Sequence, residues 1–425
     1  MVLKKLVQIW KARDLRNNIL FVLAMLVIFR LAAHIPVPGV NVSALKDFFG
    51  NNEILGLMNV FSGGSMQNFS IVMMGIAPYI TSSIIFQLLG MIVPKLEEMQ
   101  KEESGRQKIN MWTRWLTVPL AVMQSFGMIT LLRRSATNII NPDVGTIDLF
   151  AMIVTITAGT IFLMWIGELI TEKNIGNGIS LLIFAGIVSG LPQALQSFGL
   201  NSGSGDMFTI LGFALIAIVT VVAVVIISEG QRNIPVQYAK QVRGGRTTGG
   251  TSTHLPLRVN MAGVIPIIFA ISVVLFPSMV AQFFVNAKTA WIASFANKTI
   301  EVLQDQFIYG VLYFILVFAF TFFYTEVIFH PNRIAENLQR QGGFIPGIRP
   351  GKQTIEYLTN TTHRIVFVGA LFLAIIAVLP LVMQFFTKNQ TMAIGGTSLL
   401  IVVSVVIETV KQIESQLTMR EYEGK

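Results

Sequence analysis

Side chains with catalytic potential are few in this sequence, and they do not assemble into a recognisable reaction centre. The four histidines fall at the edges of apolar runs or in polar loops, and neither an H-E-x-x-H zinc motif nor a G-x-S-x-G nucleophile turn is present. No pair of carboxylates lies inside an apolar run. The absence of cysteine excludes thiolate nucleophiles, thiolate metal sites and disulfides.

Two glycine-containing stretches resemble phosphate-binding loops only in part. Residues 347–352 are one residue too short for such a loop, and Gln353 stands where a Ser or Thr would bind magnesium. Residues 176–178 lack a third glycine, because position 181 is Leu. We therefore expect no catalytic residues, no enzymatic activity, no bound metal and no cofactor.

The composition is that of a membrane protein. Hydrophobic residues make up 53% of the chain and charged residues 12%, whereas soluble domains carry about 25% charged residues. No charged side chain occurs between Lys173 and Asp206, between Arg258 and Lys288, or between Arg364 and Lys388. Each run exceeds the roughly 20 residues that cross a bilayer, and backbone polar groups in lipid must be satisfied within the segment. These runs are therefore predicted to be transmembrane helices.

Apolar windows predict ten spans in an all-α membrane protein. The predicted spans are 18–36, 71–92, 114–132, 148–169, 179–197, 207–228, 259–283, 307–329, 365–386 and 393–410. The alternating loops carry about 24 Lys and Arg residues on one side and about 7 on the other. By the positive-inside rule, both termini are expected in the cytoplasm.

The first apolar run imitates a secretory signal peptide, since several Lys and Arg residues precede it. However, Arg30 follows the run directly, and the sequence His34-Ile35-Pro36 comes next. We therefore expect a first membrane anchor here.

The region between Ile54 and Pro94 has no charge over its whole length, which is too long for one span and awkward for two. A polar, glycine-containing break lies inside it, at residues 62–68. One solution is a short half-helix over about 54–62, followed by a full span that begins at Ile71. The other is an amphipathic segment that lies on the bilayer surface, and the periodicity favours neither.

Two long polar loops, 229–258 and 330–364, carry basic residues beside Gly and Pro. Gly permits tight turns and Pro fixes the chain direction, so both loops are expected to project with arginines near their tips. Simple positive-inside topology explains the charges of an ordinary loop. Because about 30 residues exceed what a connection requires, a docking role is also considered.

An ion-coupled transporter of small solutes is the alternative function class. Such proteins place ionisable groups deep in the membrane, where charge is costly. Here Glu168, Glu229, Glu326 and Glu408 lie near predicted cytoplasmic span ends, and Arg30 lies near the outer end of its span. These positions are typical of interface anchors and helix-end charges.

Eight stretches, in order along the chain, resemble the SecY family of protein-conducting channels. They are FR with IPVPG (29–30 and 35–39), NVFSGG (59–64), GIAPYI (75–80), EESGR (102–106), IGNGIS (175–180), STHLPLRVN (252–260), GGFIPGIRPG (342–351) and GGTSLLI (395–401). The resemblance implies two pseudo-symmetric halves of five spans around an hourglass pore, at residues 1–198 and 199–425. It also favours the re-entrant half-helix over the surface helix, as a plug within about 54–68.

The resemblance further implies two sets of residues for the pore. Aliphatic side chains are expected to ring its constriction, where they offer no hydrogen bonds to water or ions. The expected ring residues are Ile76, Ile80, Ile179, Ile183, Ile268 and Ile401. The expected plug residues are Leu57, Met58, Asn59, Val60, Phe61, Ser62, Gly63 and Gly64.

A lateral gate is implied between spans 2 and 3 on one side and spans 7 and 8 on the other. Thr81, Gln87 and Asn260 match the polar cluster of this gate. Hydrogen bonds between such groups in membranes average about 0.6 kcal/mol. They would therefore bias the gate shut without locking it.

The implied partners are other translocation components. The family works with the small membrane subunits SecE and SecG, the SecA ATPase, the ribosome, preprotein signal sequences and the lipid bilayer, in the cytoplasmic (inner) membrane. Lys240, Arg243 and Arg246 match the first docking loop and Arg349 the second, although position 245, basic in some relatives, is Gly here. Basic tips suit the phosphates of ribosomal RNA. The implied function is a passive polypeptide channel that opens across the membrane and sideways into it.

Overall fold

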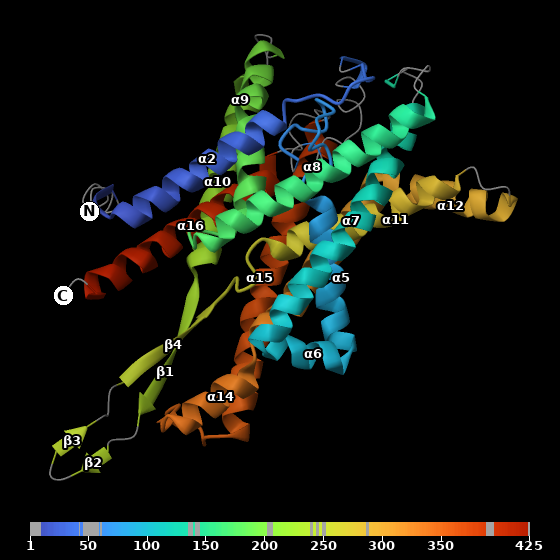
Figure 1. Ribbon diagram of the computed structural model, residues 1–425. Helices are drawn as coiled ribbons and strands as arrows, with labels where there is room; N and C mark the ends of the chain where they lie inside the picture. The colour runs from blue at the N-terminus through green and yellow to red at the C-terminus, as the bar shows by residue number, and fades with distance from the viewer. Residues whose placement is uncertain are drawn as a thin grey trace.

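The computed structural model describes residues 10–41, 43–45, 59, 62–134, 139–140, 145–201, 207–238, 241–243, 246–248, 252–285, 289–387 and 395–423. Within these residues the chain is mostly helical, with a small sheet at one end of the molecule (Figure 1). The long helices are α2 (Arg13–Ala32), α5 (Ala77–Ile92), α7 (Glu103–Arg134), α8 (Thr146–Glu172), α9 (Gly178–Asn201), α10 (Met207–Glu229), α11 (Ile265–Phe284), α13 (Gln306–Ile328), α15 (Lys352–Thr387) and α16 (Gly395–Glu423).

Each of these ten helices overlaps one of the ten predicted spans, which confirms the prediction of their number and order. On the described residues, α2, α7, α8, α13 and α15 are each long and apolar enough to cross a membrane. Helix α5 meets the same test together with the short helix α6 (Pro94–Lys101), from which it is bent by 108°. Shorter apolar stretches lie in α9, α10 and α11.

The first five and the last five long helices form two sets that meet along a seam. Helix α11 packs on α13 of its own set, and also on α5 and α7 of the first set. Helix α16 packs on α10 of its own set and on α9 of the first. The seam therefore runs through the centre of the bundle, where α5, α7, α9, α11 and α16 come together.

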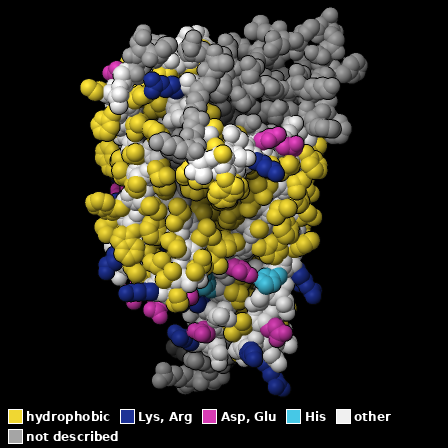
Figure 2. Space-filling view, turned by 90° about the vertical axis from the view of Figure 1, so that its right-hand side faces the viewer, with side chains coloured by type: hydrophobic (Ala, Val, Ile, Leu, Met, Phe, Trp, Pro, Cys, Tyr) yellow, Lys and Arg dark blue, Asp and Glu magenta, His cyan; other side chains and the backbone are white. Residues whose placement is uncertain are grey.

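The outer surface of the bundle is apolar. Figure 2 shows a broad band of hydrophobic side chains across the middle of the molecule, with Lys, Arg, Asp and Glu above and below it. Large apolar side chains are exposed on several helices, among them Leu31, Phe150 and Ile218, with 64%, 68% and 63% of their area accessible. Soluble proteins rarely expose contiguous apolar patches of such extent, so this face contacts lipid.

Three of the four acids at the predicted span ends pair with bases on other helices. Glu168 lies 2.6 Å from Arg114, Glu229 lies 2.7 Å from Lys411, and Glu326 lies 3.6 Å from His363. Each pair joins two long helices near their polar ends. This pairing agrees with helix-end charges and gives no support to ion coupling at the membrane centre.

The predicted start of the second span, at Ile71, is wrong. Residues 62–76 form a chain of turns, and the helix begins only at Ala77, with Pro78 in its first turn. Phe69 and Gly75 adopt left-handed conformations, with φ of 45° and 56°, which a helix cannot accommodate. Most of the predicted half-helix, 54–62, lies outside the described residues.

The two long polar loops fold together instead of projecting separately. Strand β1 (Gln231–Tyr238) pairs antiparallel with β4 (Ser252–Arg258) and with β5 (Gly343–Phe344), so the first loop is joined to the second. A second ladder, β2 (Gln241–Arg243) with β3 (Arg246–Thr248), extends the hairpin to the point farthest from the helices in Figure 1. The short helix α14 (Pro331–Arg340) follows α13.

A separate hydrophobic core stabilises this polar end. Its buried members come from β1, β4, the loop after β5, and the start of α15: Ile234, Val236, Leu257, Ile345 and Leu358. Along β1 the buried residues alternate with exposed ones, as expected for a strand with one covered face. The tips of both loops are therefore carried on a packed unit.

A further short helix, α12 (Ala290–Gln304), lies between α11 and α13 and projects from the side of the bundle (Figure 1). Trp291 and Phe295 stack on its exposed face, with ring centroids 6.3 Å apart. Neither α6 nor α12 was predicted, because each is too short to register as an apolar span.

Candidate functional site

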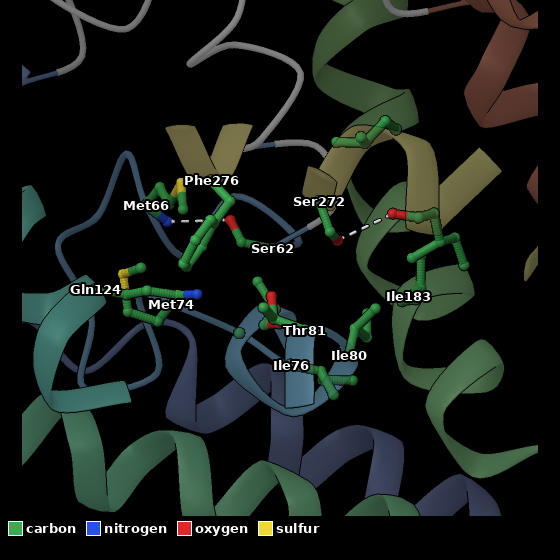
Figure 3. A pocket seen from close by; sticks show the side chains of 14 residues that line it. Ser62, Met66, Met74, Ile76, Ile80, Thr81, Gln124, Ile183, Ser272 and Phe276 are labelled. Atoms are coloured by element: carbon green, nitrogen blue, oxygen red, sulfur yellow. Dashed lines mark hydrogen bonds between the residues drawn. The ribbon is translucent and has the colours of Figure 1, made fainter. Parts of the chain in front are cut away.

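A narrow cavity of about 80 Å³ lies at the central seam. Its walls come from the 62–76 turn segment, α5, α7, α9 and α11, and Figure 3 shows their side chains converging on it. The aliphatic members are Ile76, Ile80, Ile183, Ile268 and Ile271. This volume holds a few water molecules, each of which takes about 30 Å³ in the liquid, and it is far too small for a polypeptide.

Helical spacing explains why these isoleucines face the same space. Ile76 and Ile80 are four residues apart at the start of α5, and Ile268 and Ile271 are three residues apart on α11. Residues at these spacings lie on one face of a helix. Ile183, from α9, lies beside Ile80, across the cavity from Met74 and Gln124 (Figure 3).

The hydroxyl groups at the cavity are already satisfied by the protein itself. Ser62 donates to the carbonyl of Asn59 at 2.9 Å, Thr81 to the carbonyl of Ala77 at 3.0 Å, and Ser272 to the carbonyl of Ile268 at 2.9 Å. Their protons are therefore not available to water in the cavity. The cavity is thus lined mainly by apolar side chains, with these hydroxyl oxygens and the amide of Gln124 as its polar groups.

Four of the six predicted ring residues line this cavity, namely Ile76, Ile80, Ile183 and Ile268. Ile179 lies one turn earlier on α9 and packs beside Gly167 of α8. Ile401 is fully buried in α16, within the main core. A role at a pore constriction stays a prediction for all six.

The sequence reasoning missed several cavity residues. Ile271 could have been found from Ile268, since it follows one helical turn later. Met66, Met74 and Phe276 also line the cavity, and they come from turns and from a helix position that no spacing singled out. Met66 and Met74 lie in the turn segment at 62–76, and Phe276 lies on α11, one helical turn after the cavity residue Ser272.

The described part of the predicted plug lies against the cavity. Ser62 lines it, and the buried Asn59 accepts a hydrogen bond from the backbone N–H of Gln67 through Oδ1 at 3.0 Å. Gly63 and Gly64 follow Ser62 with φ of 71° and 77°. Leu57, Met58, Val60 and Phe61 lie outside the described residues.

The three residues expected in the polar cluster of the lateral gate bond locally or lack a partner in the structure, and their role in a gate stays a prediction. Thr81 bonds within its own helix, and Asn260 donates through Nδ2 to the carbonyl of Gly263 at 3.2 Å, closing the turn before α11. Within the described part of the chain, these two and Gln87 make no hydrogen bonds to one another. The side-chain carbonyl oxygens of Gln87 and Asn260 are buried without a partner.

The predicted docking residues lie at the polar end. Arg243 and Arg246 are paired across the β2–β3 ladder, and Lys240 lies outside the described residues. Arg349 is exposed in a turn between Gly347 and Gly351, whose φ values are 82° and 101°. Its carbonyl accepts from the hydroxyl of Thr354 at 3.0 Å, which fixes the turn.

Comparison with known proteins places this architecture in one family. The protein translocase subunit SecY of Streptomyces scabiei is 44% identical over 430 residues, covering 98% of each chain. The protein translocase subunit SecY of Staphylococcus aureus is 43% identical over 435 residues, covering 100% of this chain and 99% of the relative.

Solved structures share the fold. One described as a protein conducting channel aligns with a TM-score of 0.61 at 17% identity, covering 93% of this chain and 91% of that chain. Another, reported in work on how the plug domain of SecY stabilises the closed state of the translocation channel, aligns with a TM-score of 0.58 over the same shares. A family model described as SecY matches residues 70–410. The chain therefore belongs to the SecY family.

Proposed function

We propose that this chain is the protein-conducting channel of the translocase in the cytoplasmic membrane. It passes unfolded preproteins across the membrane and releases their hydrophobic segments sideways into the bilayer. The observation that carries the proposal is the small cavity, lined mainly by apolar side chains, where the two sets of helices meet.

Isoleucine side chains suit both tasks of such a channel. A closed aliphatic constriction offers water and ions no hydrogen bonds, so it dewets and blocks conduction. The same side chains have no polar specificity, and they pack around almost any residue of a passing chain. Ile76, Ile80, Ile183 and Ile268 would form this ring, joined by Ile271 and, once the pore widens, by Ile179 and Ile401.

The lateral gate would be the seam of α11 against α5 and α7. Packing holds this seam shut, while the unpaired carbonyl oxygens of Gln87 and Asn260 favour opening. A buried acceptor without a partner destabilises the closed gate by about 1–3 kcal/mol. Opening would remove this penalty, because water or a polar group could then donate a hydrogen bond to the oxygen. Each apolar residue of an entering signal sequence favours the centre of the membrane by roughly 0.3–0.6 kcal/mol, and this free energy would also favour the open gate. The gate is therefore poised for opening by a modest signal.

Energy would come from outside the chain. The basic polar end, with Arg243, Arg246 and Arg349, would face the cytoplasm together with both termini, following the excess of Lys and Arg on that side, to which Lys240 also contributes. SecA or the ribosome would dock there, and SecE and SecG would be the membrane partners. Residues 1–198 and 199–425 would act as the two halves that part at the seam.

Reconstitution tests this function against the transporter alternative. Vesicles that contain the chain with SecE and SecG should remain sealed to ions and solutes until SecA, ATP and a preprotein are added. Protease-protected preprotein should then accumulate inside. Uptake of a small solute along an ion gradient, without SecA or preprotein, would instead identify a transporter.

A further inference from the structure

A second and larger cavity lies where the apolar bundle meets the polar end. Its volume is about 480 Å³, and its walls come from α6, the last turns of α13, the first turn of α14 and the first half of α15. Figure 2 shows acidic and histidine side chains along the lower border of the apolar band, on the side of the polar end. Helix α6 packs on α5 and α7 of the first set, whereas the other walls belong to the second set. A ligand in this cavity would therefore contact both sets of helices.

The N-terminus of α14 opens onto this cavity, which His330, Pro331, Asn332 and Arg333 all line. The N-cap residue His330 makes no side-chain cap hydrogen bond within the described part of the chain, and Pro331 has no backbone N–H. The N–H of Ile334 is the first to reach a carbonyl of the helix, and it donates to His330 at 3.2 Å. The N–H groups of Asn332 and Arg333 therefore have no acceptor within the helix, and such groups bind anions.

A buried hydroxyl group without a partner lines the same cavity. Thr362 of α15 is 5% exposed, and its Oγ1 has no hydrogen-bond partner among the described residues. Threonine hydroxyls in helices often donate to the carbonyl four residues earlier, as Thr325 on another wall of the cavity does to Thr321 at 2.7 Å. Burial of a polar group without a hydrogen bond is costly. The Thr362 hydroxyl is therefore expected to donate to an acceptor on a ligand.

Basic side chains outnumber acidic ones around the cavity. The titratable residues that line it are Lys101, His330, Arg333 and His363, with Glu97 and Glu326. Lys101 pairs with Glu97 at 2.7 Å, and His363 lies 3.6 Å from Glu326, so each acid already has a base beside it. Arg333 forms no ion pair with the residues that the structure describes. Its guanidinium is therefore available to an anionic ligand.

The electrostatics of Glu97 agree with this excess of positive charge. Lys101 holds the pKa of the Glu97 carboxyl below its usual range through a hydrogen bond and through its charge. His330 and Arg333 act on the same pKa in the same direction, although they belong to the start of α14 and Glu97 belongs to α6. The positive charge at the start of α14 thus extends across the cavity.

Part of the lining is apolar and continues onto the lipid-facing surface. Phe322, Phe329 and Val366 line the cavity from the end of α13 and from α15, two helices that pack together. Beside them in the sequence, Ile328 and Phe367 are half exposed, at 50% and 52%. A free phosphate group needs no such wall, whereas a phospholipid carries its phosphate next to acyl chains. The combination of an anion site and an apolar wall therefore favours a lipid headgroup.

We propose that this cavity binds the headgroup of an anionic phospholipid such as phosphatidylglycerol. The Arg333 guanidinium and the N–H groups at the start of α14 bind the phosphate, and the Thr362 hydroxyl donates to a further oxygen of the ligand. Phe322 and Val366 contact the glycerol and the first carbons of the acyl chains. With the orientation proposed above, the lipid comes from the cytoplasmic leaflet. The site does not depend on the central cavity, so it can be tested apart from the channel function.

Lipid binding to the full chain, purified with its membrane subunits in detergent, tests the site. Radiolabelled phosphatidylglycerol is titrated onto the immobilised protein, and the retained lipid is counted. Arg333→Gln should raise the concentration for half-saturation by about tenfold or more, because charge-assisted hydrogen bonds are the strong ones. Arg340→Gln, at the exposed far end of α14, should leave this concentration unchanged. Equal affinities in the two variants would overturn the proposal.

Thr362→Val separates ligand binding from a structural role. Valine matches threonine in shape and the hydroxyl has no described partner to lose, so the lipid-free variant should unfold at an unchanged or higher temperature. Its affinity for phosphatidylglycerol should fall several-fold. A lower unfolding temperature without lipid, together with unchanged affinity, would make the hydroxyl purely structural and contradict the site.

Competition identifies the source of the phosphate. Unlabelled phosphatidylglycerol should displace the labelled lipid at lower concentrations than zwitterionic phosphatidylethanolamine, and inorganic phosphate should not displace it. Displacement by inorganic phosphate would show a site for a free anion and reject the lipid. Equal displacement by both lipids would show that the negative charge of the headgroup is not recognised, which also rejects the proposal.

Discussion

Arg349→Glu is expected to abolish motor-driven export while the protein still inserts into the membrane at its normal level. The side chain is exposed at the polar end, in a turn held by Gly347, Gly351 and the bond from Thr354 to the Arg349 carbonyl. A rigidly presented arginine is a typical interface hot spot, worth about 2 kcal/mol or more, which corresponds to a loss of roughly 30-fold in binding. Charge reversal adds repulsion to that loss.

The measurement is SecA-dependent uptake of a preprotein into vesicles, together with the affinity of SecA for the channel. Arg340→Gln supplies the control, since Arg340 is also exposed, at the end of α14, and pairs only weakly with Glu336 at 3.8 Å. It should export normally. Normal export by Arg349→Glu would show that SecA docks elsewhere.

Replacing two cavity isoleucines by asparagine should make the closed channel conduct ions. Ile183 and Ile268 line the cavity from α9 and α11, and nearby hydroxyls are already bonded to backbone carbonyls. A buried amide without partners costs about 1–3 kcal/mol, so each asparagine would favour a hydrated cavity by roughly tenfold. The double variant Ile183→Asn with Ile268→Asn should therefore leak strongly in planar-bilayer conductance.

The matched control keeps the shape of the cavity and its apolar character. Ile183→Leu with Ile268→Leu conserves volume and offers no hydrogen bond, so it should remain sealed. A sealed asparagine variant, or leak of equal size in the leucine variant, would show that polarity of these side chains does not control conduction.

The spans could be predicted from the sequence because lipid imposes a strong and simple rule. Uncharged runs such as 259–283 and 365–386 predict helices, because a helix satisfies its own backbone polar groups in lipid, and α11 and α15 occupy most of these two runs. Motif resemblance and helical spacing also singled out four isoleucines that line one cavity in the structure, while their role in a pore stays a prediction. The uncharged runs and the helical spacing can both be read from short segments of the sequence.

The remaining features depend on contacts between distant segments. The turns at 62–76 are stabilised by backbone hydrogen bonds to residues 35–37 and by close packing against Gly159 and Gly186. The apolar pattern contains no sign of these contacts, so it predicted a helix from Ile71. The sheet forms because β1 pairs with β5 more than 100 residues later. The alternation of Ile234 and Val236 was the local signal for β1, but the basic and glycine-rich composition obscured it.

For the expected gate residues, too, the sequence did not show which groups the side chains contact. Residue type shows that Thr81 and Asn260 can form hydrogen bonds, but not with which partner. In the structure Thr81 bonds to the carbonyl four residues earlier and Asn260 to Gly263, which are the nearest acceptors. Local bonding therefore replaced the predicted bonds across the gate.

Crosslinking to a stalled polypeptide tests the central claim most directly. Single cysteines in place of Ile80, Ile183 and Ile268 are expected to form crosslinks with a cysteine in the middle of a preprotein arrested during export, since these side chains surround its path. A cysteine in place of Ile218, on the exposed surface of α10, should form none. Crosslinks at position 218, with none at the three cavity positions, would contradict a central pore.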